Sequence, residues 1–226
     1  MDVTNTEAFR AIVENTTQDL PLDRAVALIA GIANESVLPA EILSKFDEMA
    51  AACDSKSVLG LMKFLFGPGK FAGNTINFQD PANSLFDSVL IRKLGIPISL
   101  SALAIEIAKR KDFELLPIGM PGNFLVQSGN DDDQYFDPFR GADSLSSRAC
   151  VDLFLNLNPQ AQWSDSYLQP ITNRAVIIRM LTNLKMIYIQ TNNIVGLRWV
   201  MRLRLMFQEV AVLENDQWAR LMRSTN

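Results

Sequence analysis

The sequence has 226 residues, of which 48% are hydrophobic and 20% are charged, a composition typical of a folded protein with a sizeable core. Its net charge of −4 argues against a phosphate-binding surface, so nucleic acid is not expected as a partner. The chain contains no histidine, which removes the commonest general base, excludes a Ser-His-Asp triad and weakens most zinc chemistry.

The two cysteines indicate neither a disulfide framework nor a metal site. Cys53 and Cys150 are too few for the first and too far apart in sequence for the second, so we expect two buried free thiols, no metal and no cofactor. The chain begins with acidic and amide residues rather than a basic segment and an apolar run, which predicts no secretory signal. Its apolar runs are far shorter than a membrane span. These features predict a soluble, cytoplasmic protein with no membrane partner.

The first part of the chain has apolar residues at helical spacing. This pattern runs from Glu7 to about Ala52, with Pro21 and Pro39 at or near helix starts. A further apolar helix is predicted over residues 58–66, and Gly67-Pro68-Gly69 ends it. We therefore predict an N-terminal helical subdomain over residues 1–66.

A turn-rich segment and a buried helix follow. Residues 77–84 are rich in turn formers, and Asn83 or Ser84 is predicted to cap a helix carrying Phe86 and Val89. After a break at residues 95–97, residues 98–111 form a helical pattern that is apolar almost all round until Glu106. Such a helix is expected at the centre of the fold.

The pattern of apolar residues then changes from helical spacing to one typical of strands. Residues 113–118, 123–128 and 134–136 are short and rich in bulky apolar side chains, which predicts three strands and an α+β fold. The acidic residues 131–133 lack the spacing of a calcium loop, so they are interpreted as a solvated hairpin turn.

The chain is predicted to be helical again after Gly141. Residues 173–190 and 194–210 form an αα-hairpin of nearly the length of a tetratricopeptide repeat, joined by a turn at residues 191–193. Its large apolar residues are expected to leave a surface for a protein partner: Trp199, Met201, Met206 and Phe207.

Four blocks of sequence carry a family resemblance. They are Asp80-Pro81-Ala82-Asn83-Ser84, Gly95-Ile96-Pro97-Ile98-Ser99-Leu100-Ser101, Pro121-Gly122-Asn123-Phe124-Leu125-Val126 and Phe136-Asp137-Pro138-Phe139. In this order and at this spacing they resemble the SirB-type transglutaminase-like family. The resemblance extends upstream to residues 71–74 and downstream to residues 179–185.

This resemblance implies a papain-like core over residues 67–160, with a central helix on an antiparallel sheet. It also implies a tetratricopeptide-like C-terminal region, here residues 171–226. In catalytic transglutaminase-like proteins a cysteine begins the central helix, a histidine lies on the following strands and an aspartate orients the histidine. A helix N-terminus stabilises a thiolate, and the imidazole accepts and returns its proton.

The sequence departs from that pattern at two of the three positions. The start of the helix offers Pro97, Ser99 and Ser101 but no cysteine, and the position equivalent to the nucleophile is Pro97 or Ser99. The histidine of the family's Pro-Gly-His-Phe-Leu-Val block is Asn123, and only Asp137 matches. An amide cannot accept a proton at neutral pH.

These departures leave three vestigial site candidates, Ser99, Asn123 and Asp137. The favoured interpretation is structural: Ser99 caps its helix, Asp137 orders a turn, and Asn123 bridges them as a hydrogen-bonding amide. The expected function is that of a catalytically inactive protein-interaction or scaffolding module with a protein partner. The alternatives are a residual hydrolase or acyltransferase that uses Ser99 with Asp137, and a small-ligand binder in the vestigial cleft.

Overall fold

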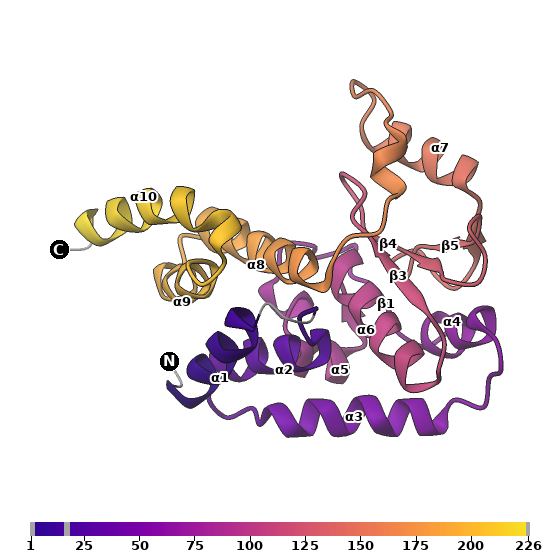
Figure 1. Ribbon diagram of the computed structural model, residues 1–226, viewed down its shortest axis with the longest axis horizontal. Helices are drawn as coiled ribbons and strands as arrows, with labels where there is room; N and C mark the ends of the chain where they lie inside the picture. Colours follow the sequence, from indigo (N-terminus) through magenta and orange to yellow (C-terminus); the bar gives the residue numbers. More distant parts are fainter. Residues whose placement is uncertain (1–2, 16–18, 225–226) are drawn as a thin grey trace.

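The computed structural model describes residues 3–15 and 19–224 (Figure 1). The helices are α1 (Val3–Glu14), α2 (Leu22–Ala33), α3 (Pro39–Ala52), α4 (Val58–Phe66), α5 (Phe86–Arg92), α6 (Pro97–Arg110), α7 (Ser147–Leu157), α8 (Asn173–Gln190), α9 (Ile194–Arg204) and α10 (Gln208–Ser224), with short 3-10 helices η1 (Pro81–Asn83) and η2 (Asp165–Leu168). The strands are β1 (Ala72–Gly73), β2 (Leu94–Gly95), β3 (Leu115–Ile118), β4 (Leu125–Ser128), β5 (Tyr135–Phe136) and β6 (Ser144–Leu145).

Helix α6 lies at the centre of the fold, as its nearly continuous apolar sequence predicts. Every residue from Ile98 to Ala108 is buried, Glu106 included. The helix packs against α2, α3 and α4 as well as against β3 and β4. Pro97 occupies its first turn, where the missing N–H leaves no hydrogen bond unmade. The central helix is therefore confirmed, one residue earlier than expected.

The main sheet is a four-stranded antiparallel meander in the order β3-β4-β5-β6. The three predicted strands are confirmed in shorter form, and the mixture of helices and small sheets confirms the α+β class. The sequence did not indicate β6 or the parallel pair β1 and β2, because two-residue strands are too short to carry a periodic pattern.

The predicted cap of α5 is wrong. The N-cap residue is Leu85, which makes no side-chain cap bond. Asn83 is instead buried as a bridge: its amide nitrogen donates to the Asn77 carbonyl at 2.7 Å, and its amide oxygen accepts from Asn74 at 3.0 Å. Asp80 supplies the local cap, accepting from the Ala82 N–H at the start of η1. The polar side chains of Asp80 and Asn83 therefore bond within or close to the turn-rich segment and do not cap α5.

The predicted return helix is also wrong in its extent. Residues 173–190 form α8 as expected, but α9 ends at Arg204 and a third helix, α10, begins at Gln208. The Met206 N–H donates to the Leu203 carbonyl at 3.1 Å in the intervening turn. This turn buries Phe207 and directs α10 back along α9 and α8, a rearrangement that apolar periodicity alone does not reveal.

The residues predicted to form a partner surface on the hairpin are not exposed. Trp199, Met201 and Phe207 are buried, and Met206 is partly buried against the same core. Phe207 packs edge-on against Phe9 of α1, with ring centres 6.1 Å apart. These side chains hold the C-terminal helices on the N-terminal ones, so they are not available to a partner.

One hydrophobic cluster extends from α1 to Phe207 and includes residues of both the N-terminal helices and the C-terminal ones. A smaller cluster lies under α7 and includes Cys150. Both cysteines are buried and free, as predicted. The division at residues 1–66, 67–160 and 171–226 stays a prediction, and its outermost ends lie beyond the described residues. Within the described residues, no helix has the length and apolar character needed to cross a membrane.

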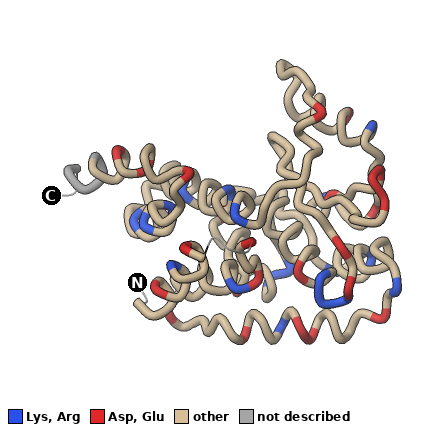
Figure 2. Tube along the Cα trace, in the orientation of Figure 1, with Lys and Arg blue, Asp and Glu red and all other residues tan. Residues whose placement is uncertain are grey.

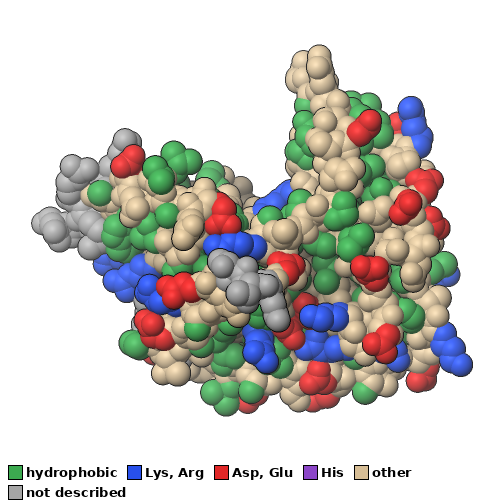
Figure 3. All heavy atoms as spheres, viewed as in Figure 1, with side chains coloured by type: hydrophobic (Ala, Val, Ile, Leu, Met, Phe, Trp, Pro, Cys, Tyr) green, Lys and Arg blue, Asp and Glu red, His purple; other side chains and the backbone are tan. Residues whose placement is uncertain are grey.

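Charges of both signs are distributed along the chain (Figure 2). Helix α3, for example, carries three acidic residues and one lysine. On the face drawn in Figure 3, basic and acidic side chains are interspersed among apolar and uncharged atoms.

Candidate functional site

The centre of the candidate site is a hydrogen bond between Asn123 and Asp137. Strands β4 and β5 pair antiparallel with Val126 opposite Phe136, so the residues before β4 lie near those after β5. The Asn123 amide nitrogen donates to Asp137 Oδ2 at 2.7 Å, and both side chains are buried. Gly122, with a φ of 79°, makes the tight turn that presents Asn123.

Asp137 accepts several hydrogen bonds. Its Oδ1 accepts from the Phe139 N–H at 3.1 Å, and the Arg140 guanidinium lies 3.3 Å from Oδ2. Burial raises the pKa of the Asp137 carboxyl above its ordinary value, while the hydrogen bond from Asn123 and the charge of Arg140 act in the opposite direction. The carboxylate therefore orders the turn that leaves β5, as the structural interpretation predicts.

Both polar ends of the Asn123 side chain are occupied. Its Oδ1 accepts from the Phe124 N–H at 2.8 Å, while its nitrogen donates to Asp137. This pairing fixes the orientation of the amide, since a flipped side chain would set two acceptors or two donors against each other. An amide held in this way contributes no proton acceptor to the site.

Ser99 caps the start of α6. Its Oγ accepts from the Ile96 N–H at 3.0 Å and lies 2.6 Å from the Asn83 carbonyl oxygen and 3.0 Å from the Ile96 carbonyl oxygen. The single hydroxyl proton is therefore directed to a backbone oxygen. The predicted capping role is present, and the hydroxyl also links η1 to α6.

The structure brings two of the three predicted residues together. Asn123 is hydrogen-bonded to Asp137. Within the described residues, the structure records no hydrogen bond from Ser99 to either of these side chains. The predicted Ser-Asn-Asp network is thus reduced to a pair. The Ser101 hydroxyl donates to the Phe124 carbonyl, next to Asn123, at 3.3 Å. Pro97, the other candidate for the nucleophile position, is the partly buried first residue of α6.

Arg179 of α8 is a site residue that the sequence reasoning missed. Its Nη2 donates to the carbonyl oxygens of Met120 and Asn123, at 2.9 and 2.6 Å. The guanidinium carbon lies 5.2 Å from the centre of the Phe124 ring, and burial lowers the pKa of this arginine. A cation among the buried positions of an apolar helix was the available signal, because a buried charge requires partners. Arg179 fixes the loop that carries Asn123.

Neither Cys150 nor a cluster of acidic side chains in the described residues adds a thiolate nucleophile or a metal site to this pair. Burial raises the pKa of the Cys150 thiol to about 12, so at neutral pH it stays protonated and unreactive. Within the described ranges, 3–15 and 19–224, no cluster of three acidic, cysteine or histidine side chains is arranged to hold a metal ion. The pair can bind and orient neighbouring groups, but it offers no proton acceptor of ordinary strength beyond the Asp137 carboxylate.

The chain is similar in sequence to a known superfamily and to several known proteins. A profile described as the transglutaminase-like superfamily matches residues 29–182. A UPF0162 protein of Xylella fastidiosa is 35% identical over 136 residues, which are 58% of this chain and 48% of that protein. A UPF0162 protein of Pseudomonas aeruginosa is 29% identical over 149 residues, 66% of this chain and 53% of that protein. Human F-box only protein 21 is 38% identical over 71 residues, 31% of this chain and 11% of that protein.

The chain spans about half the length of the UPF0162 relatives that it matches. No solved structure matches it significantly. The profile covers α6, the antiparallel sheet, the Asn123–Asp137 pair and the part of α8 that holds Arg179. The resemblance carried by the four sequence blocks is thereby confirmed, and the chain belongs to the transglutaminase-like superfamily, as a member of its SirB-type branch.

Proposed function

We propose that this chain is a cytoplasmic, catalytically inactive member of its family that works as a protein-interaction or scaffolding module. The observation that carries the proposal is the hydrogen bond from the Asn123 amide to Asp137, at the position where catalytic relatives are expected to hold a histidine base. An amide neither accepts a proton at neutral pH nor returns one to a leaving group.

The expected loss of rate is large. Removing a member of a catalytic triad lowers kcat by a factor on the order of 10⁴ to 10⁶. The nucleophile position adds to this loss, because Pro97 has no nucleophilic atom and the Ser99 hydroxyl is bonded to backbone groups. Burial raises the pKa of Asp137, yet its oxygens already accept from Asn123 and from the Phe139 N–H.

Exposed apolar side chains support a binding role. Val195 of α9 is 77% exposed, and Val212 and Leu213 of α10 are 78% and 72% exposed. Apolar side chains exposed to this extent are available for contact with another protein. The match to F-box only protein 21 covers 11% of that protein, so family sequence also occurs within a much longer chain. Both observations suit a module that acts through contacts.

Catalytic inactivity is tested with a serine-directed fluorophosphonate probe. We expect no covalent labelling of Ser99 in the folded protein, because the hydroxyl has no base and is buried. The measurement is mass spectrometry of the digested protein, with an active serine hydrolase as the positive control. A probe adduct on Ser99 that forms in the folded protein, but not when the protein is unfolded before the probe is added, would overturn the inactivity and favour the residual hydrolase.

The binding role is tested with the intact chain as bait. We expect a protein recovered from extract, then purified separately, to bind the chain in titration calorimetry with a Kd of about 10 µM or tighter. Heat-denatured bait is the control for adhesion to apolar surface. If recovered proteins adhere equally to the denatured bait and none binds the folded chain in solution, the module has no partner of the proposed kind.

A further inference from the structure

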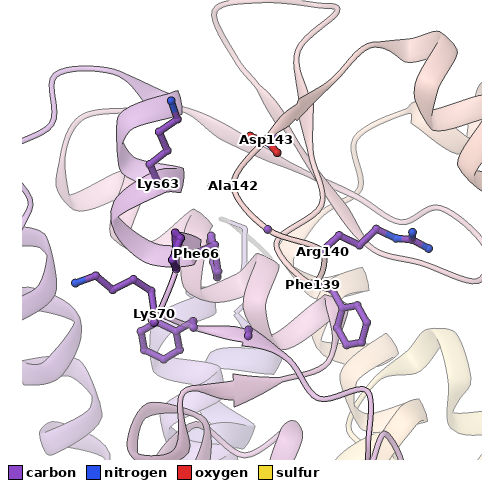
Figure 4. A pocket seen from close by; sticks show the side chains of 13 residues that line it. Lys63, Phe66, Lys70, Phe139, Arg140, Ala142 and Asp143 are labelled. Atoms are coloured by element: carbon purple, nitrogen blue, oxygen red, sulfur yellow. The ribbon is translucent and has the colours of Figure 1, made fainter.

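A groove of about 630 Å³ lies beside the candidate site, between α4 and the loop that follows Asp137 (Figure 4). One wall consists of the end of α4 and the chain leading to β1, and the other consists of residues 139–143. Its volume is within the range of about 300–1,000 Å³ that is usual for ligand sites in proteins. The groove is neither enclosed nor flat, so it is accessible from solvent.

The rim of this groove is basic although the protein is acidic overall. Lys63 and Lys70 extend from the α4 side and Arg140 from the opposite loop, while Asp143 is the only acidic residue among those that line the groove. In the described part of the chain, the structure records no ion pair for Lys63 or Lys70. Arg140 has one contact, to Asp137 at 3.3 Å. In a chain with a net charge of −4, these cations mark a local preference for an acidic ligand.

Three phenylalanines line the walls of the groove. Phe66 and Phe71 are buried, and Phe139 is partly buried between the groove and Phe78. The rings of Phe139 and Phe78 meet edge-on with centres 5.9 Å apart. Gly73 allows this arrangement, because an added Cβ would lie 2.5 Å from the Phe139 ring. The groove thus combines apolar walls with a cationic rim.

Strand β1 lies next to the groove. It pairs with β2, and the N–H groups of Ala72 and Asn74 donate toward β2, both at 2.9 Å. The exposed residue Ala72 lines the groove, whereas Gly73 does not line it and lies against Phe139. The groove therefore offers a bound peptide its side chains rather than a free strand edge.

We infer that this groove binds an extended acidic peptide segment of a protein partner. Its carboxylates pair with Lys63, Lys70 and Arg140, and its apolar side chains rest on Phe71 and Phe139. A nucleic acid fits less well, because the groove is lined by three separate cations and one acidic residue rather than by a broad basic face. The inference rests on the proposed interaction function, since it names the kind of segment that the partner presents.

The test is fluorescence polarisation with the full chain and labelled nine-residue peptides. The first peptide alternates glutamate with leucine and phenylalanine, and the others replace every glutamate by glutamine or by lysine. We expect the glutamate peptide to bind at least about ten-fold more tightly than the glutamine peptide, with the affinity falling as salt is raised. Binding of the lysine peptide as tight as that of the glutamate peptide would overturn the inference.

The variant Lys63→Glu/Lys70→Glu locates the binding. We expect this variant to bind the glutamate peptide about ten-fold or more weakly than the wild type does, since two attractive charges become repulsive. The matched control is Lys56→Glu/Lys109→Glu, which makes the same change in net charge at exposed lysines outside the groove lining. Circular dichroism and thermal melting verify that both variants are folded. Equal weakening in the two variants would mean that only net charge matters, and would overturn the assignment of the groove.

Two further results separate this inference from the proposed function. If inorganic phosphate at millimolar concentration displaces the peptide completely, the groove is a simple anion site and the peptide inference fails. If a purified partner binds the chain but its Kd is unchanged by Lys63→Glu/Lys70→Glu, the interaction function stands and the groove is excluded as its site.

Discussion

Glu214→Ala is expected to lower the free energy of unfolding by about 3–5 kcal/mol, the usual cost of breaking a buried ion pair. Glu214 of α10 is 1% exposed, and it accepts from Lys185 of α8 at 2.7 Å and from Arg204 of α9 at 2.8 Å. Removing this carboxylate leaves two buried cations without their anion. Urea denaturation measures the loss, and hydrogen exchange shows whether α10 separates first.

The control for this prediction lies on the same helix. Glu209 pairs with Arg174 at 2.5 Å, but its side chain is 48% exposed. Because exposed ion pairs contribute little, Glu209→Ala is expected to cost less than about 1 kcal/mol. If both alanine variants lose the same amount, burial of the Glu214 network does not stabilise the C-terminal helices as described.

Asn123→Asp is expected to destabilise the protein by about 3–5 kcal/mol at pH 7.5, because it places an uncompensated second carboxylate in a buried site. The new oxygen replaces a donor that lies 2.7 Å from Asp137 Oδ2. Two carboxylates at that distance share one proton, so the folded-state pKa of one of them is raised.

The sign of the pH dependence follows from that raised pKa. Stability is fully present below the unfolded-state pKa of about 4 and is lost as pH rises through the folded-state value. Urea denaturation at pH 4.5, 6.0 and 7.5 should therefore show a deficit for Asn123→Asp that grows with pH. Asp137 itself has a raised pKa in the wild type, so each variant is compared with the wild type at the same pH.

The exchange variant Asn123→Asp/Asp137→Asn is the matched control. It restores one carboxylate and one amide at the same positions, with the Phe124 and Phe139 N–H groups still facing acceptors. Most of the lost stability should return. A wild-type stability for Asn123→Asp at pH 7.5, or no recovery in the exchange variant, would mean that the two side chains do not interact as the structure has them.

The sequence predicted the central part of the fold because its signals there are strong. Helix α6 is apolar on nearly every face, and α4 and α8 are rich in apolar residues and bounded by clear turn formers. The failures have different causes. Strand β6 has two residues and the break after Arg204 is a tight local turn, so neither carries a periodic pattern. Burial of Trp199 and Phe207 was missed because it depends on packing against other helices, as in the contact of Phe207 with Phe9.

The candidate site was predicted in part. Asn123 was expected to bridge Ser99 and Asp137, and its hydrogen bond to Asp137 is present, whereas Ser99 bonds to Asn83 and Ile96 instead. The sequence could not decide where the Ser99 hydroxyl points, because residues two apart on a helix differ by about 200° in direction. Arg179 was not foreseen, since its partners are backbone oxygens in a loop about sixty residues earlier.

The Ser99 hydroxyl joins two of the sequence blocks by which the family is recognised. It reaches the Asn83 carbonyl from the first turn of α6, so one hydrogen bond connects the block around η1 with the block that opens α6. Without the first block the hydroxyl would lose the nearer of its two backbone acceptors, and without the second the buried Asn83 carbonyl would lose this donor. A sequence profile that contains both blocks consequently detects this structural connection, whether or not the surface next to it performs chemistry.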